Sequence, residues 1–128
     1  MEVKAISTVT ISPRKVRLVA DAIRKLSLTQ ALQLLALAPK RSARPLTKVI
    51  QSAIANAVNN NRLSQDSLRL KAVDVMEGPV LKRFHASTRG RIHPYIKQTS
   101  HIRIVLESVE KPKAVVTTKS KVEEKEEE

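Results

Sequence analysis

The sequence is poorest in the residues that build cross-links, flexible loops and aromatic cores. It contains no cysteine or tryptophan, one phenylalanine, one tyrosine and two glycines among 128 residues. Without cysteine there is no disulfide framework and no thiolate metal site, which fits a reducing compartment. No apolar run approaches the roughly 18 residues of a membrane span, and the N-terminus MEVKAISTVT lacks the pattern of a secretory signal. We therefore expect a cytoplasmic protein with a single core.

The scarcity of glycine also argues against catalytic loops. There is no GxSxG nucleophile elbow and no phosphate loop ending in GK[ST]. The histidines His85, His93 and His101 are spaced by eight residues, which matches no compact metal-ligand motif, and no carboxylate lies near them to orient them. We expect no enzymatic activity, no metal site, no cofactor and no small-molecule substrate.

Positive charge is abundant and unevenly distributed. The chain has 24 Lys and Arg against 12 Asp and Glu, a net charge of +12. Residues 111–128 are neutral overall, so the excess belongs to the first 110 residues, and the windows 22–65 and 78–106 contain no carboxylate. Such separation weakens a compact state through self-repulsion. A polyanionic partner explains it, because Lys and Arg replace the counterions condensed on phosphates.

Residues 13–25 form the first predicted helix. Ser12 can cap its free amides, and Pro13 suits the first helical position, where its missing N–H would be unpaired anyway. An apolar stripe at helical spacing predicts one buried face and leaves a mostly cationic face outside. The stripe consists of Val16, Val19, Ala20 and Ile23.

Two further helices are predicted. The capping box SLTQ at residues 27–30 begins a short helix that ends near Pro39. Pro45 suits the first turn of the next helix, and Asn59–Asn61 are expected to end it, because Asn tolerates the left-handed conformation. Three alanines are expected to allow close packing of this helix, and three cations occupy the connector before it. They are Ala53, Ala55 and Ala57, and Lys40, Arg41 and Arg44.

Alternating apolar residues predict three strands, at residues 3–11, from residue 68 and at residues 102–106. In the second strand the apolar side changes after Ala72, as a β-bulge or a strand buried on both faces would produce. The simplest topology makes the last two strands the arms of a long antiparallel hairpin whose base joins the first strand.

The predicted fold class is therefore α+β: a three-stranded antiparallel sheet packed against three helices, with a long protruding β-hairpin at about residues 78–101. Residues 1–110 are expected to form one nucleic-acid-binding domain. The Lys/Glu-rich residues 111–128 are expected to be disordered, because they contain too few bulky side chains to bury a core.

The hairpin segment GPVLKRFHASTRGRIHPYIKQTSH concentrates the rare residue types. It contains both glycines, both aromatics and all three histidines, and no acidic residue. Arms of about ten residues would reach on the order of 30 Å, although an isolated two-stranded ribbon is marginal in water. Apolar and polar residues alternate poorly along it, and Gly90 can supply a turn with positive φ. Its cations Lys82, Arg83, Arg89, Arg91 and Lys97 can contact phosphates, and Phe84 and Tyr95 can stack on bases.

Three interpretations of this segment remain open from the residues alone. It can be a solvated surface loop, although irregular loops of this length are uncommon in compact domains. It can be the ribbon of an architectural DNA-binding protein that enters a minor groove. It can also be the extension of a structural protein inside a ribonucleoprotein.

Five short motifs resemble one family of ribosomal proteins. They occur in order along residues 3–106: ISPRKVRLVADAIR, KVIQSAIANAVNN, EGPVLKR, RGR and TSHIRIVL. Each is modest alone, but together they make the chain similar to the bacterial large-subunit ribosomal protein family L-twenty-two. The resemblance implies a three-helix, three-strand globular part near the exit of the peptide tunnel, with a hairpin in the tunnel wall.

The resemblance also implies partners and contact residues. The partners are large-subunit (23S-type) rRNA, neighbouring proteins including ribosomal protein L-four, and the nascent peptide, in the cytoplasmic ribosome. Members of the family bind rRNA early in assembly and bridge its domains. The expected rRNA contacts are Arg14, Lys15, Arg17, Lys48, Lys82, Arg83, Arg89 and Arg91, and the cations Lys40, Arg41, Arg44 and Lys97 complete the candidate set. The expected tunnel-facing tip consists of Phe84, His85, Ala86, Ser87, Thr88, Gly90, Ile92 and His93.

Overall fold

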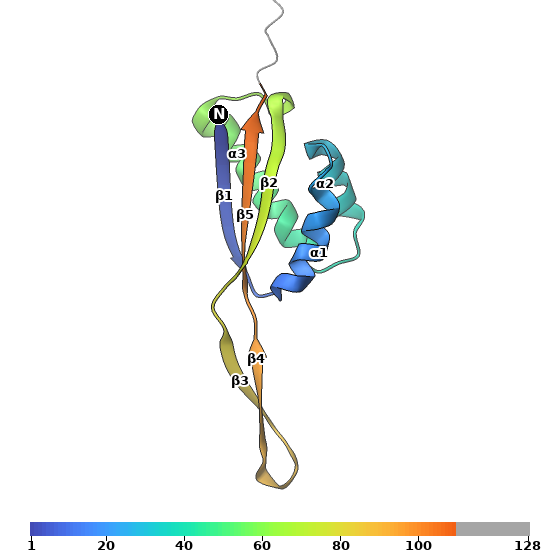
Figure 1. Cartoon of the computed structure of the whole chain (residues 1–128), viewed down its shortest axis with the longest axis vertical. Coiled ribbons are helices and arrows are strands. Elements are labelled where there is room, and N and C mark those ends of the chain that lie inside the picture. The colour runs from blue at the N-terminus through green and yellow to red at the C-terminus, as the bar shows by residue number, and fades with distance from the viewer. Residues whose placement is uncertain (110–128) are drawn as a thin grey trace, which may run out of the picture.

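The computed structural model of the chain describes residues 1–109, so the tail predicted to be disordered lies outside the described residues. A three-stranded sheet and three helices form the globular part, and a two-stranded ribbon projects from one end of the sheet (Figure 1). The predicted α+β class and protruding hairpin are confirmed. In chain order the elements are β1 (Glu2–Val9), α1 (Pro13–Ile23), α2 (Leu28–Leu37), α3 (Ala43–Asn61), β2 (Leu68–Glu77), β3 (Leu81–Ala86), β4 (Ile92–Lys97) and β5 (Ser100–Ser108), with 3-10 turns at Gln65–Ser67 and Thr88–Gly90.

The last strand in the sequence lies in the middle of the sheet. β5 pairs antiparallel with β1 on one side and with β2 on the other, which gives the order β1-β5-β2. The three helices lie on one face of this sheet, as predicted, and leave the other face open (Figure 1). The two outer strands therefore depend on β5 for all their pairing within the sheet.

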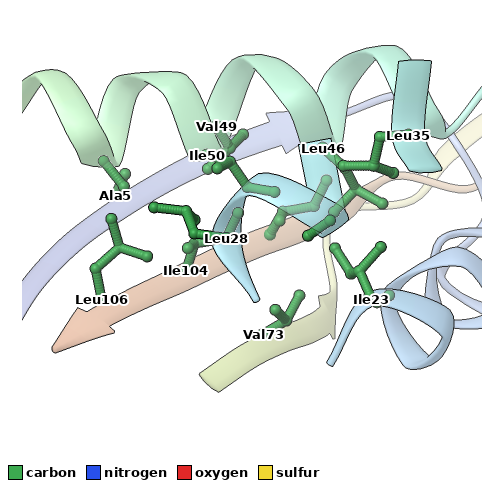
Figure 2. Packing of buried hydrophobic residues seen from close by; sticks show 14 of the residues in the cluster. Ala5, Ile23, Leu28, Leu35, Leu46, Val49, Ile50, Val73, Ile104 and Leu106 are labelled. Carbon is green, nitrogen blue, oxygen red and sulfur yellow. The ribbon is translucent and has the colours of Figure 1, made fainter. Parts of the chain in front are cut away.

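The hydrophobic core fills the layer between the sheet and the helices (Figure 2). α3 packs across β1 and β5, while α1 packs beside β2. The predicted stripe of α1 is buried in full. In α3, Ala53 and Ala57 are buried but Ala55 is exposed, because residues four apart share a helix face and the residue midway between them does not. The largest fully buried apolar side chains are Ile23, Leu46, Ile50, Ile102, Ile104, Leu106, Val16 and Val73.

A β-bulge in β2 explains the change of apolar side in that strand. Lys71 has no partner residue in β5, because Leu70 and Ala72 pair with consecutive residues of that strand. The extra residue shifts the alternation by one position, so Leu70 before it and Val73 after it both contribute to the core. Of the two explanations that the sequence left open, the bulge is the one that the structure supports.

The start of α1 differs in part from the prediction. Pro13 occupies the beginning of the helix as expected, but the Ser12 side chain makes no capping hydrogen bond. The amide of Lys15, which such a cap would satisfy, donates instead to the backbone carbonyl of Ser12 at 3.0 Å. The helix ends at Ile23, two residues before the predicted end.

Of the other helix ends, the start of α2 agrees with the prediction and the end of α3 does not. Ser27 and Gln30 form the predicted capping box at the start of α2. α3 continues through all three asparagines that were expected to end it, and the left-handed residue is Arg62, with φ 53°. A left-handed non-glycine residue costs about 1–2 kcal/mol. Here the conformation lets the Leu63 amide bond to the Ala57 carbonyl at 3.1 Å and close the helix.

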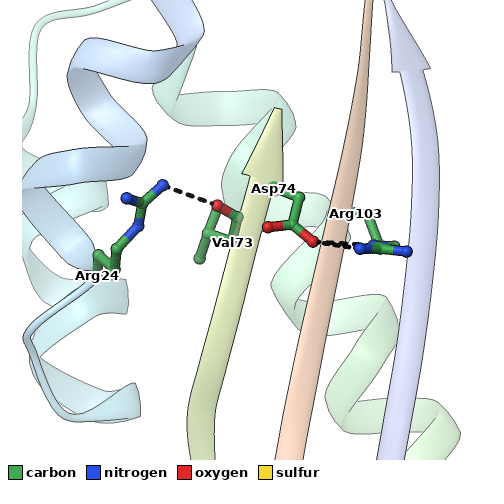
Figure 3. Close-up of polar contacts among 4 residues, drawn as sticks. All are labelled: Arg24, Val73, Asp74 and Arg103. Carbon is green, nitrogen blue, oxygen red and sulfur yellow. Dashed lines mark hydrogen bonds and ion pairs between the residues drawn. The ribbon is translucent and has the colours of Figure 1, made fainter. Parts of the chain in front are cut away.

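Two arginines of the α1 segment bond to the outer edge of β2. The Arg24 Nη2 atom donates to the Val73 carbonyl at 3.1 Å (Figure 3), and the Arg17 Nε atom donates to the Val75 carbonyl at 3.3 Å. These carbonyls lie on the side of β2 away from β5, so the arginines satisfy an edge that would otherwise be free to pair with another strand. Arg17 therefore makes a hydrogen bond within the domain in addition to its predicted contact with rRNA.

Ion pairs cross the open face of the sheet. Arg103 of β5 donates to the Asp74 carboxylate of β2 through Nε at 2.9 Å and Nη2 at 2.6 Å (Figure 3). The bulged Lys71 reaches across the sheet, and its Nζ lies 2.5 Å from Glu2 Oε1 and 3.9 Å from Glu107 Oε1. Glu2, Asp74 and Glu107 are thus engaged with basic groups of the same sheet.

Buried hydroxyl groups hold the base of the hairpin against the domain. The Gly78 amide donates to the Thr99 carbonyl at 2.9 Å, and Thr99 Oγ1 donates to the Pro79 carbonyl at 2.5 Å. Ser100, whose exposed fraction is 0%, donates through Oγ to the Ile11 carbonyl at 3.0 Å. A Cβ at Gly78 would lie 2.5 Å from Thr99 Oγ1, so this close approach requires glycine. The contacts fix the direction in which the hairpin leaves the sheet.

Candidate nucleic-acid interface

The hairpin is an exposed two-stranded ribbon separate from the main sheet. β3 and β4 pair antiparallel over six residues each, shorter than the ten-residue arms expected. The segments between this ribbon and the main sheet, residues 78–80 and 98–99, contain no strand residues. Every residue from 82 to 98 is exposed, so the ribbon buries no core of its own. Its side chains are therefore available to a surface outside the chain.

The pairing register gives the ribbon two chemically different sides. Side chains alternate along a strand and directly paired residues share a side. One side, called here the apolar side, carries the pairs Lys82–Ile96, Phe84–Pro94 and Ala86–Ile92. The other, called the polar side, carries Leu81–Lys97, Arg83–Tyr95 and His85–His93. The apolar residues that alternated poorly in the sequence are thus divided between two sides, with Phe84, Ile92 and Ile96 together.

An aromatic stack lies on the polar side. The rings of His85 and Tyr95 stack with centroids 4.3 Å apart and planes inclined by 12°. The two residues are diagonal neighbours across the strands, so the stack agrees with the register. On the same side Arg83 pairs with Tyr95, which places a cation beside the aromatic pair. Flat rings and a guanidinium suit contacts with nucleobases and phosphates.

The ribbon turns at residues 87–91. Gly90 has the positive φ expected of it, 71°, and Arg89 before it also lies in the left-handed region, with φ 57°. The Ser87 amide donates to the Arg91 carbonyl at 2.8 Å and closes the turn. Nothing lies within 4 Å of a Cβ built on Gly90, so its requirement for glycine comes from the backbone conformation alone. The turn projects Arg89 and Arg91, both exposed, at the far end of the molecule.

The seven candidate cations of the globular part are exposed, and five of them line two clefts. One cleft, of about 510 Å³, lies between the start of α1, the α2–α3 connector and the base of β4; Lys15, Lys40, Arg41 and Lys97 line it. The other, of about 610 Å³, lies between α2 and α3; Lys40, Arg41, Arg44 and Lys48 line it. The structure thus brings Lys97 of the hairpin beside cations of the globular part, which sequence separation concealed. Arg14 and Arg17 are exposed on α1.

None of the twelve candidate cations forms an ion pair within residues 1–109. The pairs found there join Arg24 to Asp21, Lys71 to Glu2 and Glu107, and Arg103 to Asp74, and none of these basic residues was a candidate. Among residues 1–109, the candidates therefore keep their charge unpaired on the surface. Uncompensated, exposed cations are the electrostatic footprint of a polyanion-binding surface.

Two residues that sequence reasoning did not nominate also line the first cleft. Leu18 of α1 and Ile96 of β4 are 70% and 60% exposed, and both contribute to its wall. For Leu18, the only indication in the sequence was that it is apolar and lies outside the buried stripe of its helix. For Ile96, no short-range pattern indicated that it would lie beside α1.

Other kinds of site receive no support from the described residues. Within residues 1–109, no group of three or more His, Cys, Asp or Glu side chains is placed to hold a metal ion. None of the helices described there is both long and apolar enough to cross a membrane. What the arrangement offers chemically is positive charge, exposed rings and an exposed ribbon.

Comparison with known proteins agrees with this picture. The family model described as Ribosomal protein L22p/L17e matches residues 5–107, nearly the whole described chain, which places the protein among the ribosomal proteins. The chain belongs to the ribosomal protein L22p/L17e family. It is 50% identical to the large ribosomal subunit protein uL22 of Mesoplasma florum over 107 residues, 83% of this chain and 96% of the relative. The proteins of the same name from Mycoplasma capricolum subsp. capricolum and Mycoplasma mycoides subsp. mycoides SC are each 48% identical over the same shares of the two chains.

Proposed function

We propose that the protein is a non-enzymatic, structural component of the large ribosomal subunit that binds large-subunit rRNA. The observation that carries this proposal is the set of twelve exposed candidate cations without ion-pair partners in residues 1–109, five of them on a ribbon without a core. A phosphate backbone would compensate the charge, and packing against RNA would supply what the isolated ribbon lacks. Relatives that are named large-subunit proteins support the proposal.

We further propose that the globular part lies near the exit of the peptide tunnel, with the hairpin lining the tunnel of a cytoplasmic ribosome. The exposed ribbon and its fixed direction at Gly78 and Ser100 suit a part that reaches into an assembly. On this proposal the partners are 23S-type rRNA, neighbouring proteins including L-four, and the nascent peptide. A chain with cations on both its globular part and its ribbon suits bridging separate rRNA domains during assembly.

The register refines which tip residues can face the tunnel together. Phe84, Ala86 and Ile92 lie on the apolar side, whereas His85 and His93 lie on the polar side. The two sides of the ribbon point in opposite directions, so they cannot both face the nascent peptide. The residues expected to face the tunnel therefore divide into one group on each side. We assign the polar side to RNA, because it carries Arg83 and the stacked rings, and the tip residues Phe84, Ala86 and Ile92 of the apolar side to the lumen.

Sedimentation of ribosomes tests the proposed function. The tagged full-length protein should migrate with large subunits in a sucrose gradient and move to the top of the gradient after ribonuclease treatment. Purified protein should also bind large-subunit rRNA more tightly than duplex DNA at equal salt. Recovery apart from large subunits with and without ribonuclease would contradict the proposal, and a preference for duplex DNA would favour an architectural DNA-binding role.

A further inference from the structure

The cleft between α1 and the base of the hairpin combines apolar surface with positive charge. We call it the junction cleft, and its volume is about 510 Å³. Its walls come from three places far apart in the sequence: the β1–α1 segment, the connector after α2, and residues 96–98. The volume lies within the roughly 300–1,000 Å³ typical of sites for small ligands. The cleft is thus large enough for one nucleotide.

Two large aliphatic side chains are exposed inside the junction cleft. Leu18 and Ile96 belong to different elements, and each keeps more than half of its surface exposed although both line the same hollow. Isolated exposed aliphatic residues are ordinary on protein surfaces. Two that converge from separate elements on one hollow form an apolar wall that a flat, weakly polar ring would cover.

The charged residues described in the lining of the junction cleft are all positive. Lys15, Lys40, Arg41 and Lys97 line it, and no carboxylate of residues 1–109 does. None of the four forms an ion pair with another described residue. The cleft between α2 and α3 is also cationic, but its large aliphatic lining residue, Leu35, is buried. Of these two cationic clefts, the junction cleft is therefore the one that joins exposed aliphatic residues to free cations.

The walls of the junction cleft are held in place before any ligand arrives. Ile11, which lines the cleft, accepts a hydrogen bond from the buried Ser100 hydroxyl at 3.0 Å. Ser42, also in the lining, donates through Oγ to the Lys15 carbonyl at 3.4 Å. The first bond ties the β1–α1 segment to β5 at the hairpin base, and the second ties the α2–α3 connector to α1. Preorganised walls lower the ordering cost of binding.

We infer that the junction cleft accepts one unpaired nucleotide turned out of the rRNA. Its base covers Leu18 and Ile96, and its phosphate and the adjoining phosphates contact Lys15, Lys40, Arg41 and Lys97. Any of the four bases offers a face to apolar side chains, and unpaired bases are the usual targets of RNA recognition by proteins. The inference rests on the proposed function, which supplies rRNA as the ligand. It adds that the junction cleft is the part of the protein that recognises an unpaired base.

Salt dependence of rRNA binding separates a base contact from a phosphate contact. The probe is large-subunit rRNA stripped of protein, titrated with the full-length chain at several salt concentrations. Replacing both aliphatic residues, L18A with I96A, should weaken binding about tenfold, because each alanine removes apolar surface that the base would cover. The slope of log affinity against log salt should not change, because no phosphate contact is removed. K15A should instead lower the magnitude of the slope by about one phosphate contact.

A matched double variant controls for the loss of exposed apolar surface. Leu37 and Val58 are 85% and 41% exposed and lie outside the junction cleft, so L37A with V58A should bind like the unchanged protein. Circular dichroism should show both double variants folded. Equal affinities for the two double variants would overturn the base contact while leaving rRNA binding intact. No binding of the unchanged protein to rRNA would overturn the proposed function and this inference together.

Photo-cross-linking in assembled large subunits gives an independent test. A benzophenone amino acid placed at residue 18, or separately at residue 96, should cross-link to the same single nucleotide. The same group at residue 37 should not reach that nucleotide. Cross-links to two distant nucleotides, or to a neighbouring protein, would overturn the inference even if the chain enters subunits normally.

Discussion

Carboxylates are scarce in this chain, and their positions determine which cations remain free. Asp74, Glu2 and Glu107 are engaged by Arg103 and Lys71 on the open face of the sheet. These pairs hold neighbouring strands together and take up acidic groups that could otherwise neutralise the candidate surface. Buried hydroxyl groups also serve contacts within the domain: the Ser100 hydroxyl donates to the backbone carbonyl of Ile11, which belongs to another segment. Arg103 and Lys71 thus carry positive charge that is paired within the sheet, whereas the candidate cations carry positive charge that faces outward.

The Lys71–Glu2 pair should be visible in a titration. The hydrogen bond that Lys71 donates and its positive charge lower the pKa of Glu2, and the same hydrogen bond to Glu2 is the main cause that raises the pKa of Lys71. A lowered glutamate pKa contributes stability that is present above the unfolded-state pKa and is lost as pH falls through the folded-state pKa. The raised lysine pKa contributes stability that is lost as pH rises through its folded-state value.

Carbon NMR of the Glu2 carboxyl group should therefore report a pKa below that of an ordinary glutamate. In K71M this pKa should rise toward the ordinary value. K4M removes a charge that makes a smaller contribution and should raise the pKa by less. An unchanged Glu2 pKa in K71M would show that the pair is not populated in solution.

Ser100 should matter for stability more than its size suggests. S100A removes the donor to the Ile11 carbonyl in a fully buried position, so the unfolding free energy should fall by about 1–3 kcal/mol. S52A is the matched control, because Ser52 is exposed in α3 and alanine favours a helix. Urea denaturation followed by circular dichroism measures both, and equal stability of the two variants would contradict the role of this hydrogen bond.

For the helices and strands, the sequence predicted those features that depend on residues close together in the chain. Helical spacing in α1 and the capping box of α2 identified those helices, and the two strands that flank the hairpin suggested its topology. The bulge at Lys71 stayed ambiguous, because a change of apolar side has two explanations until a partner strand fixes the register. The Ser12 cap failed because a backbone carbonyl satisfied the same amide.

The candidate site was predictable only as a set of cations. Charge distribution and the family resemblance nominated the residues, but neither could place Lys15 beside Lys97 in one cleft. That neighbourhood depends on where β4 leaves the domain, a property of the folded chain. The division of the hairpin into two sides also needed the pairing of His85 with His93, because the register cannot be derived from the turn residues alone.

The two sides of the hairpin should respond differently to substitution. Arg83 and Phe84 are consecutive and exposed, and they lie on opposite sides of the ribbon. R83A should lower the magnitude of the salt slope of rRNA binding by about one phosphate contact. F84A should leave both the slope and the affinity unchanged, because Phe84 is uncharged and is assigned to the lumen. Titration of large-subunit rRNA measures affinity and slope, and a loss of affinity in F84A equal to that in R83A would refute the assignment of sides.

For the whole molecule, the globular part and the ribbon have different sources of stability. The layer of buried residues between the sheet and the helices holds the globular part, whereas every residue from 82 to 98 is exposed. The link between them is short and closed by the Gly78–Thr99 hydrogen bond. The domain should therefore fold without the ribbon, while the ribbon should depend on a surface outside the chain.

Removing the ribbon tests this division. Replacing residues 79–98 with an Asn-Gly turn keeps Gly78 and Thr99 as the closing pair. The unfolding free energy should fall by no more than about 1 kcal/mol, the value of the lost Thr99–Pro79 hydrogen bond, while rRNA affinity drops. The contrasting variant L106A empties a fully buried site and should cost about 2–5 kcal/mol. A ribbon-free chain that is unfolded by circular dichroism would place the ribbon within the core.

The central position of β5 sets the order in which this protein can fold during its own synthesis. β1 and β2 pair with β5 and not with each other, and β5 begins only at Ser100. A nascent chain that has exposed its helices and both outer strands still lacks every pairing partner of the sheet. Pairing between β1 and β5 joins the two ends of the described chain, a contact pattern associated with slow folding. The sheet therefore assembles late, after the ribbon has been made.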